Sequence, residues 1–186
     1  EGAIKEVSEL LDKLVKAVKT AEGASSGTAA IGEVVADADA AKVADKASVK
    51  GIAKGIKEIV EAAGGSEKLK AAAAAKGENN KGAGKLFGKV DDAHAGDSEA
   101  ASKAAGAVSG EQILSAIVKA AGAAEQDGKK PEEAKNPIAA AIGDKDGGAE
   151  FKDEMKKDDQ IAAAIALRGM AKDGKFAVKD GEKEKA

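Results

Sequence analysis

The longest regular hydrophobic pattern in the sequence lies in residues 3–22. Apolar side chains recur there in alternating steps of three and four, and we call this set the apolar seam: Ile4, Val7, Leu11, Leu14 and Val18, with Leu10 and Val15 beside them. This spacing predicts an amphipathic helix with lysines and glutamates on its opposite face. A seam of this length requires a long partner helix, and no other segment has a comparably continuous pattern. We therefore expect part of the seam to lack a partner within residues 1–186.

A second apolar segment, residues 161–167, has no polar side. Those residues carry no charge, Asp158 or Asp159 before them is suited to cap a helix start, and Gly169 after them is suited to end the helix. A helix that is apolar all round is normally buried, and at about 1.5 Å per residue this one reaches only roughly 10 Å, far short of a bilayer. We predict a buried helix over about residues 158–171 that the other helices cover.

Two further helices are predicted between residues 28 and 65. The first begins at Thr28, ends near Lys46 and carries Ile31, Val34, Val35, Ala38 and Val43. The second begins at Ser48, ends at Gly64 and Gly65, and carries Val49, Ile52, Ile56, Ile59 and Val60. Gly51 and Gly55 lie four residues apart in the second helix, so a neighbouring helix is expected to approach it closely.

The middle of the chain has weaker signals. Ser66 predicts a short alanine helix through Ala75, residues 77–84 predict a loop, and residues 98–108 predict a short polar helix. Ser109 and Gln112 have the spacing of a capping box before the apolar residues that follow, which predicts a helix start at this point.

The last third of the chain alternates charged loops with short apolar pieces. Asn136 and Pro137 have the cap and first-turn residues of a helix, so we predict a short helix over residues 138–142. Residues 175–179 predict a short extended piece, and residues 180–186 a charged tail.

The composition favours helices throughout. Hydrophobic residues make up 43% of the 186 residues, but many are alanine, and Phe87, Phe151 and Phe176 are the only aromatic residues. Alanine has the highest helix propensity, whereas the residues that favour strands are sparse. The sequence therefore predicts a single all-α domain over residues 1–186: an irregular bundle of short helices around the buried helix, with long exposed loops and little or no sheet.

The charged residues are balanced. There are 30 basic and 33 acidic residues and no clustered basic face, so we predict no nucleic-acid partner. The absence of cysteine excludes disulfides, thiolate metal ligands and cysteine nucleophiles. No segment approaches the length of a membrane span or resembles a signal peptide, and we expect the chain to be an interior piece of a longer protein.

Two residues invite a chemical interpretation. His94 is the only histidine and lies near Asp91, Asp92 and Asp97, but a metal or acid–base role is less expected than an exposed loop histidine. Arg168 is the only arginine, and we interpret it either as a snorkelling cation or as a cation in the last turn of the apolar helix, where the helix dipole favours it. The residues required by a phosphate loop and by a calcium loop do not stand at the required spacings. We predict no catalytic, metal or cofactor-binding residues and no cofactor.

Three segments resemble one family. Residues 156–174 resemble an invariant region of the variable large protein family of Borrelia, residues 1–5 resemble the repeat that borders its variable cassette, and residues 48–60 resemble another of its signatures. This resemblance implies an antigenically variable lipoprotein on the surface of the cell outer membrane, which evades host antibodies and has no catalytic activity.

The resemblance also implies that some segments of the chain are constant and others vary. Invariant segments build the scaffold, exposed segments vary, and the lipid anchor and the flanking constant regions lie outside residues 1–186. Residues 77–109 and 125–135 are our candidates for the variable, membrane-distal surface. Host antibodies are the expected partners. The alternative is an adhesin that binds host glycosaminoglycans through lysines in these loops: Lys81, Lys85, Lys89, Lys129 and Lys130.

Overall fold

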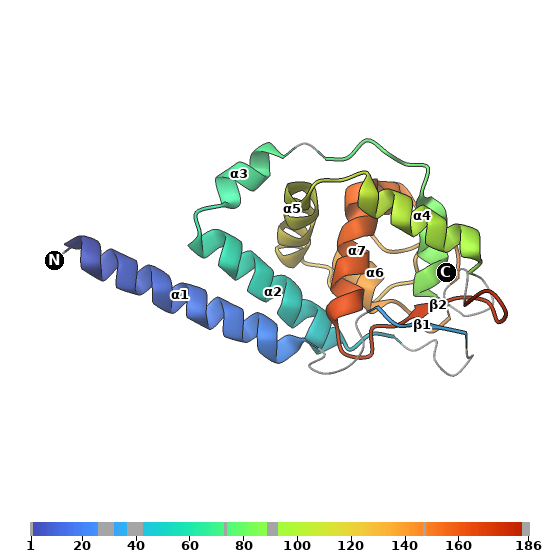
Figure 1. Ribbon diagram of the computed structural model, residues 1–186, viewed down its shortest axis with the longest axis horizontal. Coiled ribbons are helices and arrows are strands. Elements are labelled where there is room, and N and C mark those ends of the chain that lie inside the picture. The colour runs from blue at the N-terminus through green and yellow to red at the C-terminus, as the bar shows by residue number, and fades with distance from the viewer. Residues whose placement is uncertain are drawn as a thin grey trace.

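One helix, α7 (Asp158–Met170), runs through the centre of the molecule, with α4 (Ala95–Gly106) and α5 (Gly110–Ala121) on either side of it (Figure 1). The structure is a computed structural model and describes residues 2–25, 32–36, 43–72, 74–88, 93–146 and 148–183. Helices α4, α5 and α6 (Pro137–Ile142) all pack against α7. The predicted all-α fold is confirmed.

Two groups of buried side chains explain why α7 has no polar side. Ile161 and Ala164 belong to a group that contains the three phenylalanines, whereas Ala163 and Leu167 belong to a group formed with α2, α5 and α6. Because α7 lies between the two groups, apolar side chains are buried in several directions around its axis. Ile161 and Leu167 are both 0% exposed, which confirms the predicted buried helix.

The predicted cap of α7 is wrong. The helix follows Lys157 without a side-chain cap, and Asp158 and Asp159 lie buried in its first turn. The Asp158 carboxylate accepts a hydrogen bond of 2.8 Å from Asn80 Nδ2, and its backbone N–H donates to the Gly77 carbonyl. The aspartates therefore lie at the positive end of the helix dipole, with Asp158 also holding the segment around residue 80.

Two predicted helix starts are confirmed. At α5, Ser109 Oγ accepts from the Gln112 N–H at 3.3 Å while Gln112 Oε1 accepts from the Ser109 N–H at 2.9 Å, which is the predicted capping box. At α6, Asn136 Oδ1 accepts from the backbone N–H groups of Ile138 and Ala139. Elsewhere the boundaries differ: α3 (Ser66–Ala71) is shorter than predicted, and α4 begins at Ala95 instead of residue 98.

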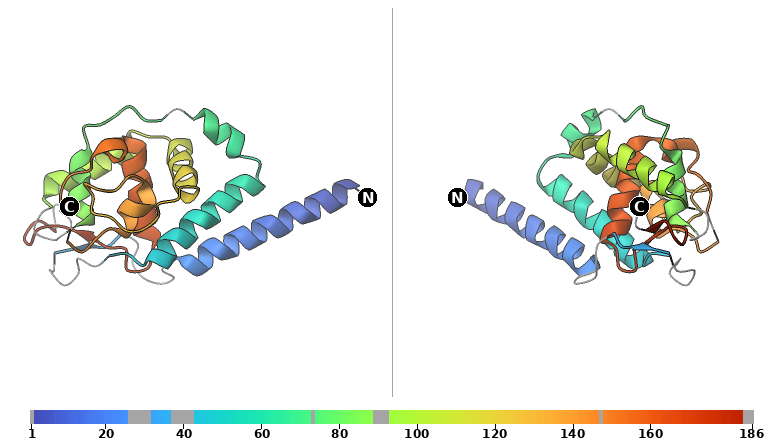
Figure 2. Two further views of the ribbon diagram at one scale, coloured as in Figure 1. Left: turned by 180° about the vertical axis from the view of Figure 1, so that it is seen from behind. Right: turned by 45° about the vertical axis from the view of Figure 1, so that its right-hand side comes forward.

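The two longest helices, α1 (Gly2–Ala24) and α2 (Lys46–Ala62), pack together at one side of the molecule, and α1 projects beyond the remaining helices (Figures 1 and 2). The close approach predicted at two glycines is confirmed. A Cβ atom at Gly51 would lie 2.5 Å from Ala24 Cβ, and one at Gly55 would lie 2.6 Å from Ala21 Cβ. Only residues without a side chain fit at these positions.

The cap predicted for α2 is also wrong. Asp45 caps the helix, because its Oδ1 atom accepts a 2.7 Å hydrogen bond from the Ser48 N–H. Ser48 instead lies buried in the first turn. Its hydroxyl donates to the Ala24 carbonyl and accepts a 2.9 Å hydrogen bond from the Lys172 N–H. It thus joins α1, α2 and the segment after α7.

A small sheet replaces one predicted helix. Val34 and Val35 form strand β1 (Val34–Val35), which pairs in parallel with β2 (Phe176–Ala177). The predicted helix over 28–46 is therefore wrong where the structure describes it; Thr28, Ile31 and Ala38 lie outside the described residues. Adjacent β-branched residues favour strands, and the edge of β2 completes their hydrogen bonds. The extended piece predicted over 175–179 is confirmed at Phe176 and Ala177.

The predicted loop over 77–84 is partly wrong. Residues from 81 onward form a 3-10 helix, η2 (Lys81–Phe87), which turns Leu86 and Phe87 into the core. A second short helix, η4 (Asp153–Lys156), precedes α7. The Phe87 ring lies 5.3 Å from the Phe151 ring and 5.4 Å from the Phe176 ring, measured between centroids, so all three aromatic residues meet in one cluster.

Candidate functional site

His94 lies at the start of α4, where its surroundings suit helix capping. Its side chain is half exposed, and its Nδ1 atom is 3.4 Å from Glu182 Oε1. The other Glu182 oxygen accepts a 2.7 Å hydrogen bond from the Ala95 N–H, and Asp97 Oδ2 accepts one from the His94 N–H at 2.8 Å. These carboxylates satisfy N–H groups that the helix leaves unpaired. Asp91 and Asp92 lie outside the described residues.

Arg168 is only 2% exposed, so the alternative of a snorkelling cation is wrong. The alternative of a cation in the last turn of α7 is confirmed. Its Nη1 atom donates to the carbonyls of Ala141 and Ile142 at 2.8 and 3.1 Å, and its Nε atom donates to the Lys175 carbonyl at 2.7 Å. The guanidinium carbon lies 5.6 Å from the centre of the Phe87 ring, within reach of a cation–π interaction.

These contacts give Arg168 a structural role. It joins the end of α6 to the segment that leads into β2. It donates to the carbonyls of Ala141 and Lys175, and it shares the Ile142 carbonyl with the Ala44 N–H. Burial lowers the pKa of Arg168 to about 10, which leaves the guanidinium charged at neutral pH. The cation therefore connects the central helix to two neighbouring segments.

The lysines proposed to bind polyanions are paired with carboxylates or partly covered. Lys81 Nζ lies 3.0 Å from a Glu150 oxygen, and Lys85 Nζ lies 3.6 Å from an Asp97 oxygen. Lys129 and Lys130 are half-buried, and Lys89 lies outside the described residues. Neighbouring carboxylates oppose the approach of a polyanion, so these contacts do not favour glycosaminoglycan binding.

The candidate variable segments combine exposed and buried residues. In α4, Glu99, Ser102 and Lys103 are exposed while Ala101 and Ala104 are buried against the core. Where the structure describes residues 77–109, they include the helices η2 and α4, and each of these helices buries one face.

Residues 125–135 have a similar division. Glu125, Asp127 and Glu133 are exposed, whereas Pro131 and Ala134 are buried. Asp127 forms a 2.5 Å ion pair with Lys46, and this pairing lowers the pKa of the Asp127 carboxyl. This segment therefore packs on the core through its buried residues while its charged side chains face solvent.

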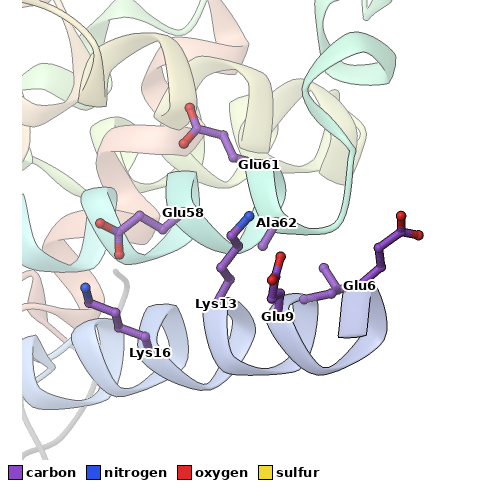
Figure 3. Close-up of a pocket in the computed structure, with 8 residues that line it drawn as sticks. Glu6, Glu9, Lys13, Lys16, Glu58, Glu61 and Ala62 are labelled. Carbon is purple, nitrogen blue, oxygen red and sulfur yellow. The ribbon is translucent and has the colours of Figure 1, made fainter. Parts of the chain in front are cut away.

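A groove lies between α1 and α2 (Figure 3). Lys13 and Lys16 of α1 point toward α2, which contributes two acidic side chains to the groove. The lining consists of six charged and two apolar residues: Glu6, Glu9, Leu10, Lys13, Lys16, Glu58, Glu61 and Ala62. The hydrophobic pattern does not predict this groove, because the groove depends on which side of α1 faces α2.

The apolar seam of α1 is largely exposed. Ile4 is 77% exposed and Val18 is 50% exposed, with Val7 and Leu11 between these values. The prediction that part of the seam lacks a partner within the chain is confirmed. Helix α2 instead contacts small side chains, with Ala17 1% exposed and Ala21 and Ala24 opposite the two glycines.

The described residues were compared with the requirements of a metal site and of a membrane-spanning helix. Among these residues, no three histidine, cysteine, aspartate or glutamate side chains come together in a way that could hold a metal ion. No helix within the same ranges has the length and apolar character needed to cross a bilayer. The absence of catalytic, cofactor and metal sites stays a prediction.

Comparison with known proteins decides the family. A model of the Borrelia lipoprotein family matches residues 1–186. The chain belongs to this family. It is 39% identical to variable large protein 17 and 40% identical to variable large protein 4, both of Borrelia hermsii, over 97% and 95% of its length. The resemblance to the variable large proteins is thereby confirmed.

A solved structure of this Borrelia family has the same fold. The crystal structure of the Lyme disease variable surface antigen VlsE of Borrelia burgdorferi matches the whole chain with a TM-score of 0.97 and 88% sequence identity. The chain covers 64% of the VlsE chain and 52% of each of the two variable large proteins. It therefore spans about half the length of these curated relatives.

Proposed function

We propose that residues 1–186 form the antibody-facing part of a variable surface antigen. The observation that carries this proposal is the separation between a covered scaffold and an exposed, charged outer layer. Ile161 and Leu167 of α7 are inaccessible to solvent, whereas Glu99, Lys103 and Glu133 protrude from segments that are themselves packed on the core. The names of the similar Borrelia proteins, as variable large proteins and a variable surface antigen, support the same function.

This separation suits antigenic variation. Substitutions at exposed positions usually change stability by no more than about 0.5 kcal/mol, whereas truncation of a buried leucine costs about 2–5 kcal/mol. A few interface residues also carry most of the energy of a protein–protein contact. Changing exposed residues therefore abolishes binding of an existing antibody while the fold is retained, which is how the protein evades the host response.

We also propose that the protein lies on the surface of the cell outer membrane. The name of the family, a Borrelia lipoprotein, supports attachment through a lipid. Antigenic variation requires no reaction chemistry, so the proposed function assigns no catalytic role to His94.

Antibody mapping tests this function. Antisera raised against the folded protein are measured for binding to a Glu99→Lys, Ser102→Asp, Lys103→Glu variant and to a matched Ile161→Val, Leu167→Met variant with changes only in α7. We expect the exposed triple variant to lose a measurable share of the antibodies and the buried variant to retain binding. Sera that bind mainly through residues 161–167 and ignore the exposed segments would contradict the proposal.

A further inference from the structure

Four aspartates in the sequence are followed directly by glycine: Asp127, Asp146, Asp173 and Asp180. In such a pair the glycine nitrogen can attack the carboxyl carbon of the aspartate, because glycine has no side chain to hinder the approach. Three of the four pairs lie entirely within the described residues, whereas Gly147 does not. Whether a pair reacts depends on how the structure holds its nitrogen and its carboxyl group.

The pair formed by Asp180 and Gly181 has its reacting groups close together. The Gly181 N–H donates a 2.9 Å hydrogen bond to Asp180 Oδ1, so the nitrogen lies beside the carboxyl carbon that carries this oxygen. Both residues are exposed in the turn that follows β2. A Cβ atom at Gly181 would meet nothing within 4 Å, so the turn has room for the rotation that brings the nitrogen onto the carbon.

The pair formed by Asp173 and Gly174 is held in a different arrangement. The Gly174 N–H donates to the Ala171 carbonyl at 3.1 Å, and the Lys175 N–H donates to the Asp173 carbonyl at 3.0 Å. A Cβ atom at Gly174 would lie 1.7 Å from the Arg168 carbonyl oxygen, so the backbone here is tightly packed. Attack on the Asp173 carboxyl would therefore require the loss of native hydrogen bonds and packing.

The pair formed by Asp127 and Gly128 is restrained by packing and by charge. A Cβ atom at Gly128 would lie 2.3 Å from the Gly143 carbonyl oxygen. The hydrogen bond and the charge of Lys46 lower the pKa of the Asp127 carboxyl. Because the reaction requires a protonated carboxyl that loses an oxygen as water, this ion pair opposes it.

We infer that Asp180 is a site of spontaneous isomerisation to isoaspartate, and that it reacts faster than Asp127 and Asp173. The Gly181 nitrogen forms a bond to Asp180 Cγ, and the amide proton leaves together with the carboxyl OH group as water. Water then adds to one of the two carbonyl groups of the resulting cyclic imide. Opening at the Cγ carbonyl restores aspartate, whereas opening at the main-chain carbonyl leaves the chain connected through the Cβ and Cγ atoms.

The turn that contains Asp180 holds Glu182 against the start of α4. The Lys179 N–H donates to the Ala93 carbonyl at 2.7 Å, and the Glu182 N–H donates to the Lys179 carbonyl at 3.1 Å. Glu182 Oε2 accepts a 2.7 Å hydrogen bond from the Ala95 N–H. Isoaspartate adds one atom to the backbone between Lys179 and Glu182, so it displaces Glu182 from the helix start. The exposed turn and the capping of α4 thus change without any change in the sequence.

Ageing of the folded chain in water labelled with heavy oxygen tests the inference. Each passage through the cyclic imide leaves one labelled oxygen in the aspartate or isoaspartate, and mass spectrometry of the peptides locates this oxygen. We expect Asp180 to take up the label several-fold faster than Asp127 and Asp173 at neutral pH and body temperature. In urea, which removes the structural differences, we expect similar rates at the three sites.

The labelling pattern in the folded protein decides the outcome for the site. Equal rates at the three aspartates, or faster labelling at Asp127 or Asp173 than at Asp180, would overturn the inference. Label at Asp180 that is recovered only in aspartate and never in isoaspartate would overturn it as well.

The effect on α4 has its own control. Asp180→Glu keeps the negative charge, but glutamate would have to form a larger and less favourable ring. Hydrogen exchange of the Ala95 amide is measured by nuclear magnetic resonance before and after ageing of each protein. We expect exchange to become several-fold faster in the aged original chain and to stay unchanged in the aged variant. An equal change in both proteins, or no change in the original chain, would overturn the displacement of Glu182.

Discussion

Helices α7 and α1 both have strong apolar patterns, yet one is buried and the other is mostly exposed. Side chains from two buried groups surround α7, and Ile161 and Leu167 are inaccessible to solvent. Helix α1 contacts α2 along its small residues and leaves Ile4, Val7 and Leu11 exposed. An apolar pattern thus identifies which side of a helix requires cover. Whether the same 186 residues supply that cover depends on the surrounding fold.

The largest expected difference between the two helices is the cost of losing one leucine. Leu167→Ala should lower the free energy of unfolding by about 2–5 kcal/mol, because it leaves a cavity between α7 and its neighbours. Leu11→Ala on the exposed side of α1 should change the free energy of unfolding by no more than about 0.5 kcal/mol. Urea unfolding followed by circular dichroism measures both values. Similar losses of stability in the two variants would contradict the difference in burial between α7 and α1.

Arg168 provides the second test of how tightly α7 is held. Arg168→Met should lower the free energy of unfolding by about 1–3 kcal/mol, because the carbonyls of Ala141 and Lys175 lose the donor that Arg168 supplies and the Ile142 carbonyl keeps only the Ala44 N–H. The matched control is Lys172→Met, at an exposed position just after the helix. The same urea titration applies, and an Arg168→Met variant as stable as the control would show that the buried cation is dispensable.

An added methyl group is expected to destabilise the protein where α1 and α2 touch and to stabilise it where they do not. Gly55→Ala should cost about 1–3 kcal/mol, since the new methyl group would lie 2.6–2.8 Å from atoms of Ala21. Gly23→Ala lies in the same pair of helices but meets nothing within 4 Å, so it should stabilise α1 by roughly 0.5–1 kcal/mol. Thermal unfolding measures both changes. Opposite signs are predicted, and equal destabilisation would contradict the close approach.

Local signals were sufficient for the parts of the fold that depend on near neighbours. The apolar run of α7, the capping box at Ser109 and the Asn136–Pro137 start each lie within a few residues of the structure that they specify. Gly51 and Gly55 also predicted a close helix contact, because no other residue type permits such an approach. For α1, the sequence predicted an apolar side but not which part of that side α2 covers, because the covering residues lie far away in the sequence.

The errors occurred where distant residues determine the structure. Strand β1 forms because Phe176–Ala177 pairs with Val34–Val35, and the spacing of so few apolar residues does not separate helix from strand. Arg168 is buried because the carbonyls of Ala141 and Ile142 surround it from another helix. Exposed and buried positions in residues 77–109 likewise depend on how η2 and α4 pack against α7.

Antibodies can measure whether α7 is covered in the native protein. Antibodies are raised against a peptide of residues 161–169, and their binding is measured in solution to the folded protein and to the same protein unfolded in urea and then diluted. We predict strong binding to the unfolded protein and little to the folded protein, because Ile161 and Leu167 are inaccessible. Equal affinity for the two forms would contradict the account, since α7 would then be exposed in the native molecule.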